Sequence, residues 1–474
     1  MNIKVLFLNV LSILWLGGTF GIAQGYEIKV SIKGYTNDTL LLGYHYGDKQ
    51  YIKDTSVSKT GSFVFKADTL LEPGMYLIVL QPDHQFFQIL IDRGKQKFSV
   101  ESDTSDLSGH LKFKGSSLNS DFNKYIDFIS DNRLKADSIG RLINEKANKE
   151  EITKLKKLLE EIDKAVKAKQ NHIIEAQPNS ILSLLIRWTL DVELPEFDGT
   201  EEEKNEKAFY YYKNHYFDYA DFLDDRSVRL PLFSSKLDRY MQKLTVQIPD
   251  SINSSLDYIL SKCKLGSDLF KYVLSTQLNN YANSKYVGMD AVYVHLVEDY
   301  YGKGKAPWID PESLAKMSSD AKALKPLLID KIAPNITVFK QDSTPISLHD
   351  VKANYTILLI WAPDCGHCKQ SMPSIKKFYD EYKSKGVEIF AVCSKTGPDE
   401  KSCWDGVSQL GMGDWINTSD PQHKSKFRLI YDVKTTPQVY FLDKNKKILT
   451  KKIAGEQFKE VMDKIIALEK NEAK

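Results

Sequence analysis

Two cysteines separated by two residues are the strongest chemical signal in this sequence. Cys365-Gly366-His367-Cys368 places the thiols one helical turn apart, which suits a reversible dithiol–disulfide pair. A thiolate attacks a disulfide, and a second cysteine this near can resolve the mixed disulfide that forms. The alternative is a purely structural disulfide between Cys365 and Cys368, but a disulfide that closes so small a loop would stabilise the fold little. The spacing therefore predicts thiol–disulfide exchange.

The elements around this motif explain why it would be reactive. The apolar run Tyr355–Trp361 predicts a strand before it, and Cys368–Lys385 has the pattern of a helix. Cys365 is thus expected at a helix N-terminus, where unpaired N–H groups and the helix dipole favour a thiolate. Further strands are predicted at 387–392, 438–442 and 448–453, with helices at about 402–410 and 457–468. A β-strand, helix and parallel strand followed by a hairpin and a closing helix is the thioredoxin arrangement.

The other cysteines raise the question of a metal site. Cys393 and Cys403 could complete four thiolates with the motif, but they are too far apart to form the second short knuckle of a structural zinc site. We therefore expect neither a metal nor any other cofactor. We favour an accessory disulfide between Cys393 and Cys403. Two independent buried thiols, or a relay that exchanges with the motif, are the alternatives.

The N-terminal segment and the net charge of the chain limit where the protein can be located and what it can bind. Met1–Ala23 has a positive start at Lys4, a short apolar core and small residues before Gln24, as is typical of a removed signal peptide. We expect a periplasmic protein, or a membrane-tethered one if this segment is retained. A formal net charge of +2 on 474 residues gives no basic field for DNA or any other nucleic acid.

The mature chain is predicted to have three parts. Short alternating strands indicate an antiparallel, sandwich-like β-domain at 24–115, and long amphipathic patterns indicate an all-α domain at 116–330. The α/β thioredoxin fold would occupy 331–474. An aromatic cluster at 209–222 is expected mainly to pack in a core, with a client-binding surface as the alternative. We find no catalytic constellation in the first two domains.

Residues from about 331 to 470 resemble the TlpA/ResA branch of the thioredoxin superfamily. The matching stretch is Leu358–Lys369, and Pro373 matches the proline that kinks the family's first helix. Thr435-Thr436-Pro437 matches the cis-proline loop that faces the cysteine pair. The resemblance implies that Thr436 offers backbone hydrogen bonds to the client and that Pro437 shapes the substrate groove. We also assign Trp361, in the matching stretch, to substrate binding.

The chain departs from the family pattern at three positions. Asp364 stands where relatives often have Trp, and its carboxylate would oppose thiolate formation. Leu359 and Ser371 stand where relatives carry the acidic residues that deprotonate the resolving cysteine. Gly366 and His367 match the motif of protein disulfide isomerases, in which the histidine stabilises the thiolate. The direction of electron flow therefore stays open.

Together these features predict a periplasmic thiol–disulfide oxidoreductase. Its clients would be exported proteins with cysteines, and an inner-membrane redox partner is implied because the dithiol must be regenerated after each turnover. The rival hypothesis is an envelope binding or scaffold protein whose thioredoxin-like domain only senses redox state or docks a partner.

Overall fold

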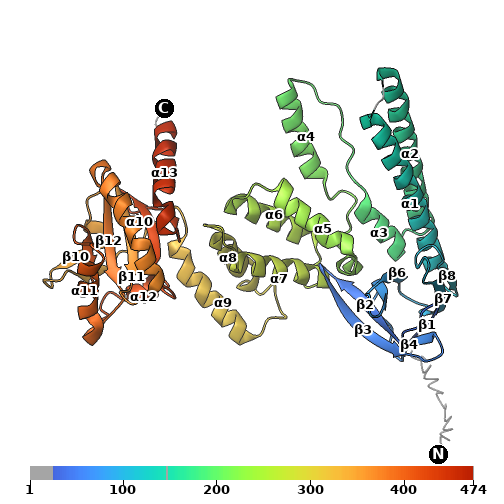
Figure 1. The fold of residues 1–474 in the computed structure, drawn as a ribbon, viewed down its shortest axis with the longest axis horizontal. Coiled ribbons are helices and arrows are strands. Elements are labelled where there is room, and N and C mark those ends of the chain that lie inside the picture. Colours follow the sequence, from blue (N-terminus) through green and yellow to red (C-terminus); the bar gives the residue numbers. More distant parts are fainter. Residues whose placement is uncertain (1–24, 146–147, 473–474) are drawn as a thin grey trace, which may run out of the picture. The chain divides into compact units, whose positions relative to one another are not determined.

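The computed structural model describes residues 25–145 and 148–472 (Figure 1). The predicted signal peptide, Met1–Ala23, lies outside the described residues. Within the described ranges, no helix is long and apolar enough to cross a membrane.

The chain forms two compact units, Met1–Leu237 and Asp238–Lys474. The helical stretch predicted at 116–330 is therefore divided between them. Its earlier helices accompany the N-terminal strands, with which α1 and α3 make contact, and its later helices accompany the C-terminal sheet.

Two four-stranded sheets open the first unit, in the orders β4-β1-β7-β8 and β3-β2-β5-β6. Their inner faces bury the alternating apolar residues of the strands, such as Ile28, Phe63 and Ile78. This arrangement confirms the β-rich N-terminal region. One pair, β1 with β7, is parallel, which differs from the all-antiparallel expectation. The strands are β1 (Tyr26–Lys33), β2 (Thr39–Tyr46), β3 (Lys49–Val57), β4 (Ser62–Ala67), β5 (Gly74–Leu80), β6 (Phe86–Ile91), β7 (Lys97–Asp103) and β8 (Lys112–Lys114).

Helices fill the rest of the first unit, and the two longest lie side by side in Figure 1. The second of them has a seam of apolar residues at alternating three- and four-residue steps, and members of this seam such as Leu155 and Ile162 are half-buried. The seam therefore packs within its own unit. The helices are α1 (Ser117–Glu145), α2 (Lys149–Ala176), α3 (Ile181–Thr189), α4 (Glu201–His215), a 3-10 turn η1 (Asp225–Arg229) and α5 (Pro231–Arg239).

The aromatic cluster after residue 208 is divided between core and surface. Tyr216, Phe217 and Phe222 are buried, as the core hypothesis requires, whereas Tyr210 and Tyr219 are exposed. Helix α4 itself buries no side chain.

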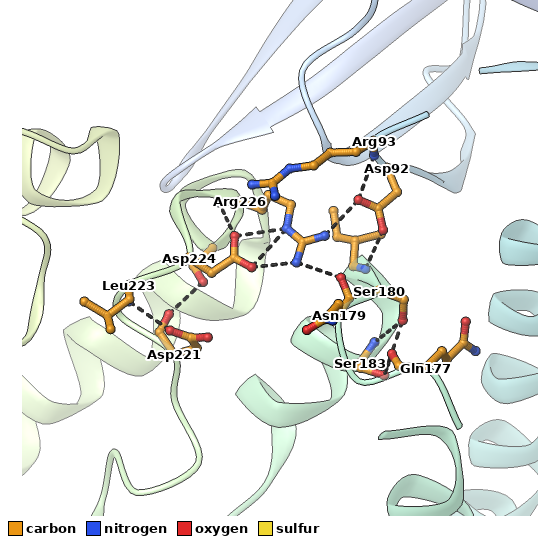
Figure 2. A network of polar contacts seen from close by, with 12 residues as sticks. Asp92, Arg93, Gln177, Asn179, Ser180, Ser183, Asp221, Leu223, Asp224 and Arg226 are labelled. Atoms are coloured by element: carbon orange, nitrogen blue, oxygen red, sulfur yellow. Dashed lines mark hydrogen bonds and ion pairs between the residues drawn. The ribbon is translucent and has the colours of Figure 1, made fainter. Parts of the chain in front are cut away.

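A buried arginine joins the β-sheets of the first unit to its helices (Figure 2). Arg226 in η1 is 7% exposed and donates hydrogen bonds to Asp224 at 2.6–3.0 Å, to Asp92 at 2.8 Å and to the carbonyl of Asn179 at 3.0 Å. Asp92, directly after β6, also accepts the N–H of Ile181 at the start of α3. Three segments distant in sequence thus share one guanidinium.

The second unit begins with helices and ends with a five-stranded sheet. Its helices are α6 (Pro249–Lys262), α7 (Asp268–Ala282), α8 (Asp290–Leu296) and α9 (Pro311–Leu324), with single-turn segments η2 (Tyr240–Leu244), η3 (Val297–Tyr301) and η4 (Lys325–Leu327). A short hairpin, β9 (Thr337–Phe339) and β10 (Pro345–Ser347), precedes the sheet.

The C-terminal sheet has the order β13-β12-β11-β14-β15, with helices on both faces, and confirms the predicted thioredoxin fold. Strand β11 is buried along its whole length because it lies at the centre of the sheet. The elements are β11 (Tyr355–Trp361), α10 (Gly366–Tyr382), β12 (Val387–Cys393), α11 (Lys401–Gln409), β13 (Ile416–Thr418), α12 (Phe427–Ile430), β14 (Gln438–Asp443), β15 (Ile448–Lys451) and α13 (Phe458–Glu472), with single-turn segments η5 (Leu348–Asp350), η6 (Lys383–Lys385), η7 (Gly397–Glu400) and η8 (Gly455–Gln457).

Candidate active site

Cys365 occupies the turn between the central strand β11 and helix α10. It is the residue that caps α10, and its Sγ accepts a hydrogen bond from the N–H of Cys368 at 3.2 Å. Both cysteines are free thiols in this structure. Cys365 is half-buried whereas Cys368 is 0% exposed, so a large client can reach only the first sulfur.

The surroundings of Cys365 favour its thiolate. Burial raises the pKa of Cys365, but its hydrogen bonds with Cys368 and Thr436, together with those from the backbone N–H groups of Cys368 and His367, outweigh this effect and lower it. The N–H donors of His367 and Cys368 lie in the first turn of α10, where a helix has N–H groups without intrahelical partners. A sulfur held in this way is a nucleophile at a pH where an ordinary thiol is mostly protonated.

Cys368 has the opposite character. Burial, followed by the hydrogen bond and the charge of Cys365, raises the pKa of Cys368 to about 12. The two thiols therefore differ in both access and protonation, as an attacking and a resolving cysteine should.

The loop before β14 faces the cysteine pair. The Thr436–Pro437 peptide bond is cis, and the Cys365 thiol donates to the carbonyl of Thr436 at 3.2 Å. Residues 71 positions apart in sequence are thereby brought together. A polypeptide that reaches Cys365 must pass this loop.

Asp364, the carboxylate expected to oppose the thiolate, has a partner. Its Oδ2 lies 2.6 Å from Nζ of Lys395, on the loop after β12. The hydrogen bond with Lys395 lowers the pKa of Asp364, so the carboxylate is charged but neighbours a cation. The ion pair reduces the negative field at Cys365.

The other predicted site residues differ in how exposed they are. His367 is exposed, and Gly366 has open space where a side chain would be. Trp361 is only 1% exposed, in contrast to its predicted contact with substrate. It packs instead beneath α11, where Gly406 leaves room for its ring.

Cys393 and Cys403 form a disulfide in this structure, with their Cα atoms 6.0 Å apart. Cys393 ends β12, where it pairs with Trp361 of β11, and Cys403 lies in α11. Both are buried, so the bond fastens α11 to the sheet behind the redox pair. Over the described ranges, no group of three metal-ligating side chains is found.

A groove of about 750 Å³ runs along the site. The redox motif contributes His367, and the loop before β14 contributes Thr435 and Pro437. Ala282 of α7 and Leu324 of α9 line the same groove. Sequence reasoning missed these two residues, because small and apolar side chains in a helix carry no chemical signal.

The lowered pKa of Cys365 predicts a pH-dependent reactivity. In the reduced protein, we expect iodoacetamide to modify Cys365 with a midpoint below about pH 8.5, the value of an ordinary thiol. Reactivity falls as the pH falls through the lowered pKa, because the thiolate is lost. Cys368, with a pKa raised to about 12, stays unmodified in the same range. Peptide mass analysis of the alkylated protein measures both.

Two variants test the cause of this shift. Asp364→Asn removes a negative charge and should move the Cys365 midpoint to lower pH, whereas Lys395→Met leaves the carboxylate unpaired and should move it to higher pH. Identical midpoints in both variants would mean that the ion pair has no effect on the thiolate.

Three known protein families match successive parts of the chain. Residues 329–466 match the family described as Redoxin. Residues 26–122 match Domain of unknown function (DUF4369), and residues 145–325 match Domain of unknown function (DUF5106).

Curated relatives share the C-terminal part. "Thiol-disulfide oxidoreductase ResA" of Bacillus thuringiensis is 31% identical over 135 residues, which cover 28% of this chain and 75% of the relative. The chain belongs to the TlpA/ResA-like branch of the thioredoxin superfamily. It is accordingly a thiol–disulfide oxidoreductase. The ResA of Oceanobacillus iheyensis is also 31% identical, over 23% of this chain and 53% of the relative.

Solved structures with similar chains include a domain of a possible thiol-disulfide isomerase from Cytophaga hutchinsonii. It is 32% identical, with a TM-score of 0.29, over 31% of this chain and 98% of that chain. A thioredoxin-like protein from Bacteroides caccae is 17% identical, with a TM-score of 0.40, over 58% of this chain and 98% of that chain.

Two of the positions at which this chain differs from the TlpA/ResA-like pattern lie close to the redox pair in sequence. Leu359 is fully buried in β11. Ser371 lies on α10 against η8, where a side chain added at Gly455 would come within 3.0 Å of Ser371. The absence of a side chain at Gly455 thus allows η8 to approach α10 closely.

Proposed function

We propose that this oxidoreductase exchanges disulfides with cysteines of exported polypeptides through Cys365 and Cys368. The observation that carries the proposal is the position of the Cys365 sulfur. It lies at the N-terminus of α10 with N–H donors on one side, the Thr436 carbonyl on the other and the resolving thiol one turn away. Pro437 shapes the entry to this sulfur, and the charge of the ion-paired Asp364 sets part of its field.

The first step is attack on a client disulfide. The Cys365 thiolate forms a bond to one client sulfur, the client S–S bond breaks, and the other client sulfur leaves as a thiolate. The backbone N–H groups that held the Cys365 charge are then released from it. The product is a mixed disulfide between the client and Cys365.

The second step uses Cys368. The neighbouring Cys365 thiolate is one reason for the raised pKa of Cys368, and this cause disappears once Cys365 is bonded to the client. Cys368 then gives up its proton more readily and attacks the Cys365 sulfur. The client leaves with both of its sulfurs reduced, and the enzyme keeps a Cys365–Cys368 disulfide. Oxidation of a client dithiol is the same sequence in reverse.

The location and the partners follow from the same proposal. The signal-peptide pattern of Met1–Ala23 supports export, and we place the protein in a periplasm. After reducing a client, the enzyme needs two electrons per turnover, and after oxidising one it must lose two. An inner-membrane thiol–disulfide protein is the partner class that would supply or remove them.

The reduction potential of the Cys365–Cys368 pair tests this function and its direction. The full chain is equilibrated with defined ratios of reduced and oxidised glutathione, and the free thiols are counted by alkylation and mass. We expect one reversible two-electron transition. A potential near about −270 mV would indicate a reductase, and one near about −180 mV an oxidase or isomerase. Failure of the pair to interconvert would contradict the function.

A further inference from the structure

The groove beside the redox pair has a wall that does not belong to the thioredoxin fold. Ala282 ends α7, Leu324 ends α9, and Leu327 lies in the following turn η4. These residues line the same groove as His367 and Pro437. The helices that precede the thioredoxin domain in sequence are therefore part of the surroundings of the active site.

A buried lysine holds this wall in place. Lys451, at the end of β15, is 2% exposed, and its Nζ lies 2.5 Å from Oδ2 of Asp290 in α8 and from the carbonyl of Leu327. A charge so deeply buried is tolerated only with a close partner of opposite charge. The tie therefore fixes the helical wall relative to the strand that lines the groove.

A second hollow extends the groove. It has a volume of about 250 Å³ and is lined by Tyr281, Tyr286 and Asp290, among others. The two hollows share Ala282, Leu324, Lys434, Lys451 and Lys452 as lining residues. Together they form a trough that leads from the redox motif along the helical wall, with Ala282 where the two parts meet.

The lining of the trough is mixed in chemistry. Leu324 and Ile453 are apolar, Gln370 and Thr435 are exposed polar groups, and charges of both signs are present. Asp432 and Glu456 face the same space as Lys434 and Lys452. A lining of this kind has no dominant charge that would select a small ion, and it offers both apolar contacts and hydrogen-bond partners along its length.

From these observations we infer that the trough binds an extended, unfolded stretch of polypeptide next to the client's cysteine. The inference rests on the proposed function, because His367 of the redox motif and Pro437 of the facing loop line one end of the trough. An extended chain presents alternating side chains and free backbone groups, which match mixed walls on two sides of a groove. An extended segment would contact the trough along its whole length, whereas a small disulfide would occupy only the part nearest His367. The helical wall thus selects unfolded clients.

The test fills the trough at the point where its two parts meet. Ala282 is exposed at the end of α7, so Ala282→Trp adds bulk without burying it in a core. Leu265→Trp is the matched control, because Leu265 is 61% exposed in the same unit and lines neither hollow. For each protein, kcat/KM is measured with an unstructured synthetic peptide that contains one disulfide and with oxidised glutathione.

We expect the ratio of the two kcat/KM values, peptide over glutathione, to fall about tenfold or more in Ala282→Trp and to stay unchanged in Leu265→Trp. An unchanged or increased ratio in Ala282→Trp would overturn the inference. Thermal melting of both variants checks that they fold. Failure of the proposed function would be seen in a different result, because the wild-type protein itself would then turn over neither substrate.

Discussion

Replacing Cys365 with alanine is expected to lower turnover by at least about a thousandfold, because the attacking sulfur is then absent. Cys368→Ala should be inactive in multiple turnovers for a different reason. Its Cys365 can still attack, but nothing resolves the product, so a covalent complex with the client accumulates. Non-reducing electrophoresis and mass spectrometry distinguish the two results.

A third cysteine provides the control for this pair. Cys263 is buried at the end of α6, and Cys263→Ala should leave turnover unchanged. Activity retained by Cys365→Ala, or a Cys368→Ala protein that never traps a client, would contradict the assigned roles.

The first unit should depend on Arg226 for much of its stability. Arg226→Met leaves Asp92 and Asp224 without their shared cation in a mostly buried place, and it removes the donor to the Asn179 carbonyl. Breaking one side of a buried ion pair costs about 3 to 5 kcal/mol. Amide hydrogen exchange in β6 and α3 measures this loss locally, without assuming that the whole chain unfolds in one step.

An exposed arginine of the same unit provides the comparison. Arg133 pairs with Asp137 on α1, and both side chains are mostly exposed. Arg133→Met should change the local free energy of opening by less than about 1 kcal/mol. Equal effects of the two substitutions would mean that the network around Arg226 is not the tie between strands and helices.

The elements nearest the chemistry could be predicted because their sequences are unambiguous. Tyr355–Trp361 is apolar throughout and forms a central strand with the predicted bounds. Helix α10 begins at Gly366, two residues earlier than expected, because Cys365 serves as its cap. The edge strand β13 was missed, since three residues give no periodic pattern.

Pairing between distant segments was beyond the reach of local patterns. Alternation in β1 predicts a strand but not that its neighbour β7 runs parallel to it. The bonds of Lys395 with Asp364 and of Lys451 with Asp290 join residues that only the folded chain brings together.

Some residues of the site could likewise be predicted from the local sequence, whereas others depend on the folded chain. The spacing of Cys365 and Cys368 is readable directly, and the loop of Thr436 and Pro437 through its resemblance to a known family. Trp361 was assigned to substrate binding within the stretch that matches the family, yet the central position of β11 buries it. The helical wall at Ala282 could not be foreseen, because nothing in an alanine marks it as part of a groove.

The complete burial of Cys368 has a consequence for damage by oxidants. Peroxide that reaches the reduced protein meets only the half-buried Cys365 and converts its thiolate to a sulfenic acid. Cys368, one turn away, condenses with this species to give the ordinary Cys365–Cys368 disulfide and a water molecule. We therefore expect over-oxidation to sulfinic acid to be slow, and an oxidative burst to leave the protein in a form that its own redox cycle repairs.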